Sequence, residues 1–310
     1  MSETRAIVAP GAQRHPVRGG SRTRRSIGGI LVRAVLILFG VFFVLPMAWL
    51  LLAPTKTAQQ IEHAFPFAFG SFDAVGTAWG HLAAFQDGVI FQWFGNSTLY
   101  AFSGLILTLV TAIPAGYGLA LTRFGGRKAL LTITLVVMIM PATTLVIPLF
   151  LGLNAVKLVG TPWALILPFA FFPFGVYLTY IYFSTSLQRS MLEAARIDGA
   201  GEVQIFFRIA LPLAKPIIAL VAFFNFVGNW QNFFLPYLVT PSSAQQPIQV
   251  GLSQLMASSP AFNPGGTADF GIDSPELALA IIISVVPVLV LFLFAQRSLV
   301  AGMFAGGTKG

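Results

Sequence analysis

The 310-residue chain contains no cysteine, and only 9% of its residues are Asp, Glu, Lys or Arg. The absence of cysteine excludes disulfides, thiolate metal sites, iron–sulfur ligation and a cysteine nucleophile. The scarcity of charge excludes a water-soluble globule, because soluble domains carry about 25% charged residues. Apolar residues take the place of the charge: 56% of the chain is hydrophobic and its mean hydropathy is +0.82. The composition therefore indicates an integral membrane protein.

Six apolar segments are long enough to cross a bilayer. A spanning helix needs roughly 20 mostly apolar residues, because it must pair every backbone polar group internally. The first segment is too long for a signal-peptide core and lacks a convincing cleavage site, so it is interpreted as a retained span. The sequence thus predicts an all-α protein with six transmembrane helices. They run from Ile30 to Ala53, Ser97 to Thr122, Ala129 to Leu153, Pro162 to Leu187, Pro216 to Val239 and Leu277 to Ala295.

Basic residues identify the cytoplasmic side of this predicted domain. If both termini share one side, all 18 Lys and Arg residues except Lys56 and Lys157 face that side. The positive-inside rule then places both termini in the cytoplasm. Residues 1–28 are polar and rich in arginine, and we expect a disordered tail there. The six-helix domain is predicted to occupy residues 29–300, with a cytoplasmic tail at residues 301–310.

Ionisable groups are almost missing from the predicted spans. Arg33 is the only one, and it lies close enough to the cytoplasmic end to reach the headgroups. Proton-coupled carriers and voltage sensors need ionisable groups at membrane depth, so both classes are disfavoured. His15, His63 and His81 lie outside the spans, which leaves no acid–base pair for an intramembrane enzyme and no metal site.

The most informative pattern lies in the predicted cytoplasmic loop, residues 188–215. Leu192 to Ile197 has a helix-forming composition, and Asp198 and Gly199 give a strong turn signal. Apolar residues then recur at helical spacing, which predicts an amphipathic second helix with one face against the membrane or the bundle. This apolar stripe consists of Val203, Phe206, Phe207 and Ala210.

This loop resembles the EAA loop of permeases from binding-protein-dependent ATP-binding cassette (ABC) importers. The resemblance rests on the sequence EAARIDGA from Glu193 to Ala200, on the later IALP and on the place of both before the fifth span. RFGGRKALL, VVMIMPATTLVIPLF, NFVGNWQNFFLPYLVT and the ending AQRSLVAGMFAGGTKG narrow the resemblance to MalG-like carbohydrate permeases. The resemblance covers roughly Leu99 to Gly310. It implies the MetI-like permease fold and a multi-pass protein of the bacterial or archaeal plasma membrane.

The same resemblance implies partners and site residues. The loop would dock on a separate ATPase subunit, so ATP and Mg are expected on that partner, and no cofactor or enzymatic activity is expected on this chain. A second, MalF-like permease, a dimer of the ATPase subunit and an extracytoplasmic sugar-binding protein would complete the assembly, with no nucleic acid. The implied ATPase-coupling residues are Glu193, Ala194, Ala195, Asp198 and Gly199. A C-terminal tail with Gly306, Gly307 and Lys309 would also contact the ATPase.

Polar side chains gather in the predicted fifth span. Unpaired amides at membrane depth cost free energy, so they face protein or a watery cavity. On one helix Asn225, Asn229 and Asn232 share a face, which predicts a row of amides along a translocation path. The alternative is that these amides bond to neighbouring helices. The predicted path residues are Asn225, Asn229, Trp230, Gln231 and Asn232.

Together these patterns predict a permease subunit that translocates a neutral sugar or oligosaccharide. Amide and aromatic side chains can meet hydroxyl groups without burying a compensating charge. Two alternatives stay open: an importer for another small solute, such as a polyamine or glycerol phosphate, and an ATP-independent channel.

Overall fold

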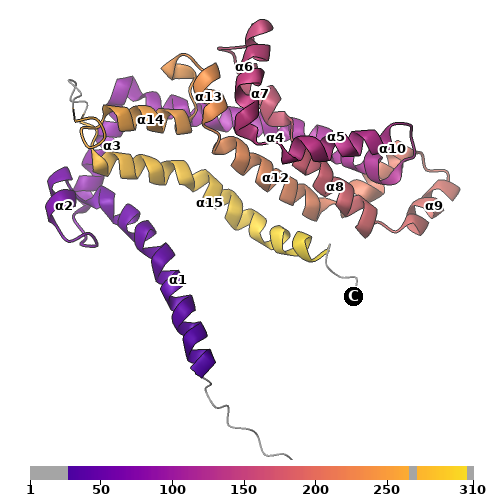
Figure 1. The fold of residues 1–310 in the computed structure, drawn as a ribbon, viewed down its shortest axis with the longest axis horizontal. Coiled ribbons are helices and arrows are strands. Elements are labelled where there is room, and N and C mark those ends of the chain that lie inside the picture. The colour runs from indigo at the N-terminus through magenta and orange to yellow at the C-terminus, as the bar shows by residue number, and fades with distance from the viewer. Residues whose placement is uncertain (1–26, 265–270, 306–310) are drawn as a thin grey trace, which may run out of the picture. The chain divides into compact units, whose positions relative to one another are not determined.

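The computed structural model describes residues 27–264 and 271–305, and every regular element within them is a helix (Figure 1). Residues 1–26 of the predicted N-terminal tail and residues 306–310 lie outside the described part. The last helix continues to Ala305, so residues 301–305, predicted as tail, are helical. The chain divides into two compact units between Ala48 and Trp49, which are described separately.

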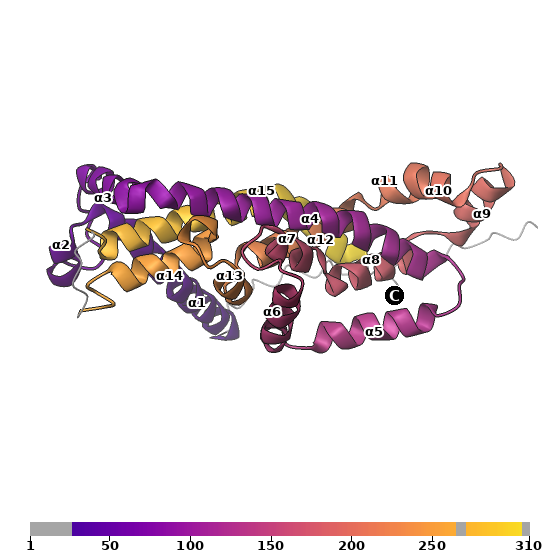
Figure 2. The same ribbon diagram turned by 90° about the horizontal axis from the view of Figure 1, so that it is seen from above.

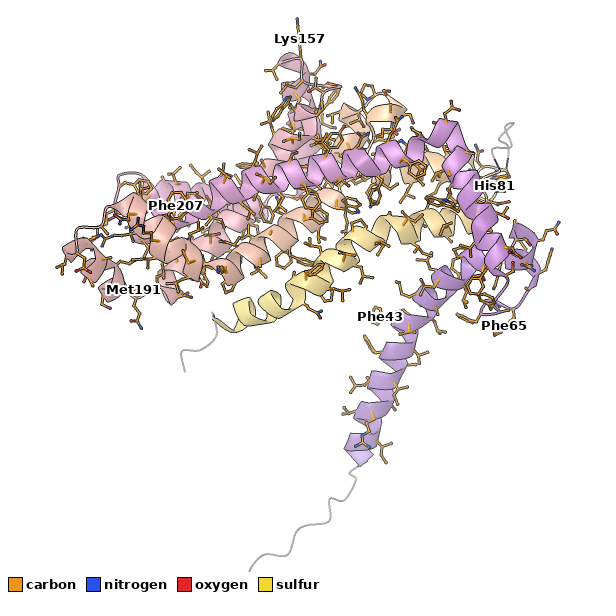
Figure 3. The ribbon with its side chains drawn as sticks, turned by 180° about the vertical axis from the view of Figure 1, so that it is seen from behind. Phe43, Phe65, His81, Lys157, Met191 and Phe207 are labelled. Carbon is orange, nitrogen blue, oxygen red and sulfur yellow. The ribbon has the colours of Figure 1, made fainter. Side chains whose placement is uncertain are left out.

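The described part of the first unit is most of helix α1 (Ile27–Leu52). Its side chains from Ile30 to Leu45 are exposed, and Figure 3 shows Phe43 among those that project from the helix. A helix that is apolar on every side is stable only where lipid or other apolar groups surround it. The predicted first span is present as a helix whose length and hydropathy are sufficient to cross a membrane.

Among the described residues, four helical stretches are long and apolar enough to cross a membrane, and six if each of two bent helix pairs counts as one span. The predicted six-span architecture agrees with this count. The four stretches are α1, residues 72–121, residues 163–186 and residues 274–296. They include α3 (Phe72–Ala84), η2 (Phe85–Gly88), α4 (Val89–Leu121), α7 (Trp163–Ala170), α8 (Pro173–Ser186) and α15 (Ser274–Ala305).

The predicted third span is one of the bent pairs. Helix α5 (Arg127–Ile139) turns by 99° into η3 (Ala142–Leu145) and α6 (Val146–Ala155). Pro141 explains the break, because a proline disfavours helical backbone in the residue before it. Met140 indeed has an extended backbone, with φ −67° and ψ 131°.

The predicted fifth span is interrupted near its end. Helix α12 (Lys215–Trp230) stops before Gln231, and a short helix α13 (Phe234–Val239) follows. Pro236 accounts for the interruption, because it has no N–H for the Asn232 carbonyl four residues earlier and its ring would clash with that carbonyl. The prediction of one continuous helix to Val239 is therefore wrong, and Asn232 does not lie on the helix that carries Asn225.

Helix α4 is central in the second unit. It packs against α7, α8 and α12, and α12 packs in turn against α15. Figure 2 shows α4 and α15 running lengthwise through this unit, with α9 to α11 at one end and α2, α3 and α14 at the other. Three buried clusters join these helices, around Trp93 and Phe226, around Phe183 and Val221, and around Leu165. Because lipid tails are as apolar as these side chains, the clusters stabilise the bundle through close van der Waals packing.

The described residues between the first and second predicted spans, and between the fifth and sixth, are largely helical. A short helix η1 (Ala53–Thr55) begins at the last residue of the first predicted span, and the two segments then contain α2 (Ala58–His63), α3, η5 (Ser243–Gln245) and α14 (Ile248–Ser258). Helix α4 also begins at Val89, eight residues before the predicted start of the second span. Trp93 explains the extension: its indole is fully buried, and Nε1 donates to the Ser243 carbonyl over 2.9 Å.

Glycine at position 116 permits the close approach of α4 to α8. A Cβ added there would lie 2.5 Å from the Thr179 Cβ and 2.9 Å from the Tyr180 amide nitrogen. Gly118 differs, because a Cβ there would meet only the Thr122 Oγ1, at 3.9 Å. Of these two glycines of α4, only Gly116 is required for close packing.

We expect Gly116→Ala to destabilise the protein by about 1–3 kcal/mol, as overpacking of a close interface does. Gly118→Ala is the matched control two residues away, and it should be neutral or slightly stabilising because alanine favours helix. Thermal unfolding of the purified protein in one detergent measures both effects. Equal melting temperatures for the two variants would contradict the assignment of the close contact to Gly116.

Candidate functional site

The loop at residues 188–215 folds as predicted into a helix, a turn and a second helical segment. Helix α9 (Arg189–Ile197) ends in a turn in which the Gly199 amide donates to the Arg196 carbonyl and the Ala200 amide to the Ala195 carbonyl, both over 3.0 Å. This pair of bonds defines a Schellman cap, whose C′ residue is left-handed. Gly199 has φ +86°, which confirms the predicted need for glycine.

The predicted coupling residues form an exposed surface on α9. Glu193, Ala194, Asp198 and Gly199 are exposed and Ala195 is half-buried. Leu192, only 2% exposed, fixes the opposite face of the helix to the bundle. Glu193 is the fifth of nine residues in α9, so it lies in the middle of the helix and not near its start. Its carboxylate points to solvent and makes no hydrogen bond within the described residues, which leaves it free for a partner.

The second half of the loop departs from the predicted apolar stripe. It consists of α10 (Glu202–Ile205), a π-helical turn η4 (Phe206–Ala210) and α11 (Leu211–Leu213). Val203 and Phe207 are 72% and 59% exposed, whereas Ile205, Phe206 and Ala210 are buried. The π turn widens the helix, so side chains no longer follow a spacing of 3.6 residues. The Tyr117 ring of α4 holds Phe206, with the two ring centroids 5.0 Å apart.

An ion pair crosses the turn. Arg196 Nε donates to Glu202 Oε1 over 2.7 Å, and the Tyr117 hydroxyl donates to Glu202 Oε2 over 3.4 Å. The hydrogen bond from Arg196 lowers the pKa of Glu202, and the same bond raises the pKa of Arg196. A pocket of about 480 Å³ opens here, with Arg123 and Glu193 also in its wall. The pair therefore connects the α9 surface to α10 and α4.

Two of the predicted path amides bond to the break between α7 and α8. Asn225 and Asn229 donate through their Nδ2 atoms to the Phe169 carbonyl, over 3.0 and 3.3 Å. Asn229 Nδ2 also contacts Asn225 Oδ1 at 2.9 Å. The Phe169 carbonyl lacks a helical donor because Pro173, four residues later, has no N–H. These asparagines therefore replace a missing backbone bond, which is the interhelical alternative named above.

The other three path residues are placed differently. Trp230 is 2% exposed, its Nε1 donates to the Ser284 carbonyl over 2.9 Å, and its ring stacks on Phe226. Gln231 is exposed and Asn232 half-buried, and neither side chain forms a hydrogen bond in the part of the chain that the structure describes. Asn225 and Trp230 are thus buried in contacts between helices. The side-chain amides of Gln231 and Asn232 are instead available for other hydrogen bonds. The predicted tail residues Gly306, Gly307 and Lys309 lie outside the described residues.

A polar contact at the other end of the unit has no signal in the sequence. His81 Nδ1 of α3 lies 2.8 Å from Glu276 Oε1 of α15, and Glu276 Oε2 accepts a hydrogen bond from the Asp273 amide. These groups line a pocket of about 290 Å³ together with Lys56. His81 and Glu276 are 195 residues apart, so only the fold brings them together. Figure 3 shows His81 and Phe65 at this end and Met191 and Phe207 at the other.

The unit consists of apolar helices, some of them broken, that meet at polar contacts, and it carries an exposed helix and turn at one end. This arrangement is typical of one class of protein, the multi-span membrane transport components. Residues 112–305 match the family model described as "Binding-protein-dependent transport system inner membrane component". This match covers more than half of the chain, and the protein belongs to that family.

Curated relatives and a solved structure agree with this assignment. The chain is 34% identical over 280 residues to the diacetylchitobiose uptake system permease NgcG of Streptomyces coelicolor, covering 89% of this chain and 87% of that protein. It is 32% identical to the arabinooligosaccharides transport permease AraQ of Halalkalibacterium halodurans, covering 73% and 76%. A bacterial ABC transporter that imports alginate has the same fold, with a TM-score of 0.77, 22% identity and coverage of 90% and 98%. The predicted MetI-like permease fold is confirmed.

We expect the protection of this loop from hydrogen exchange to depend on pH through the Arg196–Glu202 pair. Because the pKa of Glu202 is lowered in the folded state, its contribution is present above the ordinary pKa of 4.5 and is lost as the pH falls through the lowered value. Both side chains are largely exposed, so the contribution is at most about 1 kcal/mol. Hydrogen exchange of residues 189–210, corrected for the intrinsic rate at each pH, measures it.

Glu202→Gln should raise exchange in this segment at pH 7 and abolish the additional loss of protection at acid pH. Glu193→Gln is the matched control, because it removes an exposed carboxylate without a hydrogen-bond partner from the same loop. An acid-induced loss of protection that persists in Glu202→Gln would rule out this carboxylate as its origin.

Proposed function

We propose that this protein is a permease subunit of an ATP-driven importer that carries a neutral sugar or oligosaccharide across a plasma membrane. The observation that carries the proposal is the helix α9 and its glycine turn: an exposed polar surface fixed to the membrane helices by Leu192, Arg196 and Phe206. Such a surface can transmit the movement of a docked partner into the bundle. The family consists of permease subunits, which are not themselves enzymes, so ATP and Mg would bind to a partner ATPase.

A saccharide cargo is supported by relatives, and a neutral one by the chemistry of the helices. Helices α4 and α8 contain no Asp, Glu, Lys or Arg, and α12 contains only Lys215, in its first position. A polyamine would find no carboxylate on these helices, and glycerol phosphate would find no cation at membrane depth. The similar proteins named above are described as systems for diacetylchitobiose and arabinooligosaccharides, and a Bacillus subtilis relative, 28% identical, as one for maltodextrin. Other similar proteins are described as systems for sulfoquinovosyl glycerol and for polygalacturonan or rhamnogalacturonan, and the solved importer takes the acidic polysaccharide alginate. The relatives therefore support a saccharide cargo, and the uncharged helices favour a neutral one.

One permease subunit supplies only half of a transport pathway, so the assembly requires further subunits. We infer a second, MalF-like permease, an ATPase dimer and an extracytoplasmic sugar-binding protein, with both termini of this chain in the cytoplasm. The ATPase would contact the α9 surface, including Glu193, Ala194, Ala195, Asp198 and Gly199, and the tail residues Gly306, Gly307 and Lys309. On this chain we propose that Gln231 and Asn232 contact a saccharide hydroxyl through their unpaired amides, and that Asn229 does so only through its Oδ1, because its Nδ2 is bonded to Phe169 and Asn225.

We expect Gly199→Ala to lower transport-coupled ATP hydrolysis several-fold without loss of membrane insertion. No atom lies within 4 Å of the position that the new Cβ would occupy, so the effect comes from the backbone alone. An L-residue in the left-handed conformation costs about 1–2 kcal/mol. Substrate-stimulated ATPase activity of the reconstituted importer is the measurement.

Gly201→Ala is the matched control for this substitution. Gly201 lies two residues away with φ −74° and equally open surroundings, so alanine fits there without strain. Coupled hydrolysis in Gly201→Ala should stay close to that of the unmodified protein. Similar losses in both variants would indicate a contact surface that tolerates no side chain, instead of a backbone requirement at Gly199.

We expect Asn232→Leu to reduce oligosaccharide uptake or alter cargo preference while leaving the melting temperature unchanged. Asn225→Leu should instead lower the stability in detergent by on the order of 1 kcal/mol, because it removes a bond to the Phe169 carbonyl. Uptake into proteoliposomes and thermal unfolding, measured on both variants, separate the two roles. Normal uptake by Asn232→Leu would remove this residue from the translocation path.

A further inference from the structure

The segment between α2 and α3 exposes four phenylalanine rings. Phe65 and Phe72 are 70% and 80% exposed, Phe69 is 53% exposed and Phe67 is 37% exposed. The rings contact one another in two pairs: the centroids of Phe65 and Phe67 are 6.0 Å apart, and those of Phe69 and Phe72 are 5.1 Å apart. From residue 64 to residue 72 the sequence AFPFAFGSF contains no ionisable side chain. We call residues 64–72 the aromatic loop.

Lys56 holds the aromatic loop from inside. Its side chain is buried, at 3% exposed, and Nζ donates to the carbonyls of Phe65 over 3.0 Å and Pro66 over 2.7 Å. The Lys56 ammonium group thus pairs two backbone carbonyls on the inner side of the loop, and the apolar rings remain on the outer side. The loop thus has its polar groups inward and its apolar groups outward, the reverse of a water-exposed loop.

Backbone bonds fix the aromatic loop to the end of the first membrane helix. The Ser71 amide donates to the Thr55 carbonyl over 2.6 Å, and the Gly70 amide donates to Thr55 Oγ1 over 3.0 Å. A Cβ at Gly70 would collide with the Thr55 carbonyl, so this contact needs glycine. Thr55 lies only three residues after Leu52, where α1 ends. The loop is therefore attached beside the end of a helix that is long and apolar enough to cross a membrane.

We propose that the aromatic loop inserts its phenylalanine rings into the outer lipid surface and anchors the extracytoplasmic end of the permease there. Aromatic and leucine side chains on an otherwise polar segment bury several ångströms into the boundary between headgroups and acyl chains. Lipid is favoured over a protein partner by the loop's attachment at the end of a membrane span and by its lack of charge. The proposal does not depend on the cargo or on the ATPase.

The absence of cysteine from the chain allows a direct test with single nitroxide labels. Phe65→Cys and Phe72→Cys are suitable because these rings are the most exposed, so their replacement removes few protein contacts. Glu62→Cys is the matched control, from an exposed side chain on the adjoining α2. The labelled permease is placed in nanodiscs of phosphatidylethanolamine and phosphatidylglycerol, and power saturation compares accessibility to oxygen and to a water-soluble nickel chelate.

Lipid insertion predicts that labels at positions 65 and 72 are several-fold more accessible to oxygen than to the nickel chelate, with the opposite ratio at position 62. Adding Lys56→Met to the Phe65→Cys variant should increase both label mobility and nickel accessibility, because the loop carbonyls lose their donor. Labels at positions 65 and 72 that match the position 62 label would overturn the proposal. Nickel access that disappears only when the importer's binding protein is added would identify a protein docking surface instead.

Discussion

The carbonyl of Phe169 is the point on which the membrane core depends. Pro173 deprives it of its helical donor, and an unpaired carbonyl at membrane depth costs several kcal/mol. Asn225 and Asn229 of α12 and Thr108 of α4 all donate to it. The Phe169 carbonyl, which has no helical donor, therefore connects α7 to α4 and α12. The break between α7 and α8 is stable only while these helices stay together, and the polar centre of the bundle lies where they meet.

The α9 surface depends on this core through packing. Phe206 and Tyr117 contact each other, and Tyr117 lies on α4, the same helix that carries Thr108. The Arg196–Glu202 pair adds a short polar link across the glycine turn. Side-chain contacts thus run from α9 to α4 without interruption, as the proposed coupling to a partner requires.

Local patterns identified the features that depend on neighbouring residues in the chain. The turn at Gly199 was predictable, because a left-handed residue after a short helix is a local requirement that glycine meets best. The apolar stripe was only partly predictable, since the π turn at Phe206–Ala210 changes the spacing on which the prediction depends. The predicted row of three asparagines failed at Asn232, because Pro236 interrupts the helix in the preceding turn.

The sequence alone determined the class of the protein, the approximate positions of its spans, and the helix and glycine turn of the loop at residues 188–215. Hydrophobic length and the pattern EAARIDGA are local, and the backbone's need for internal hydrogen bonds in lipid leaves few alternatives. Only the tertiary structure decided which amides are paired and which are available. The pairing of Asn225 with Phe169, of His81 with Glu276 and of Lys56 with the aromatic loop joins segments that no local pattern relates. Burial and hydrogen bonding between distant segments follow from how the helices pack, and packing is a property of the whole chain.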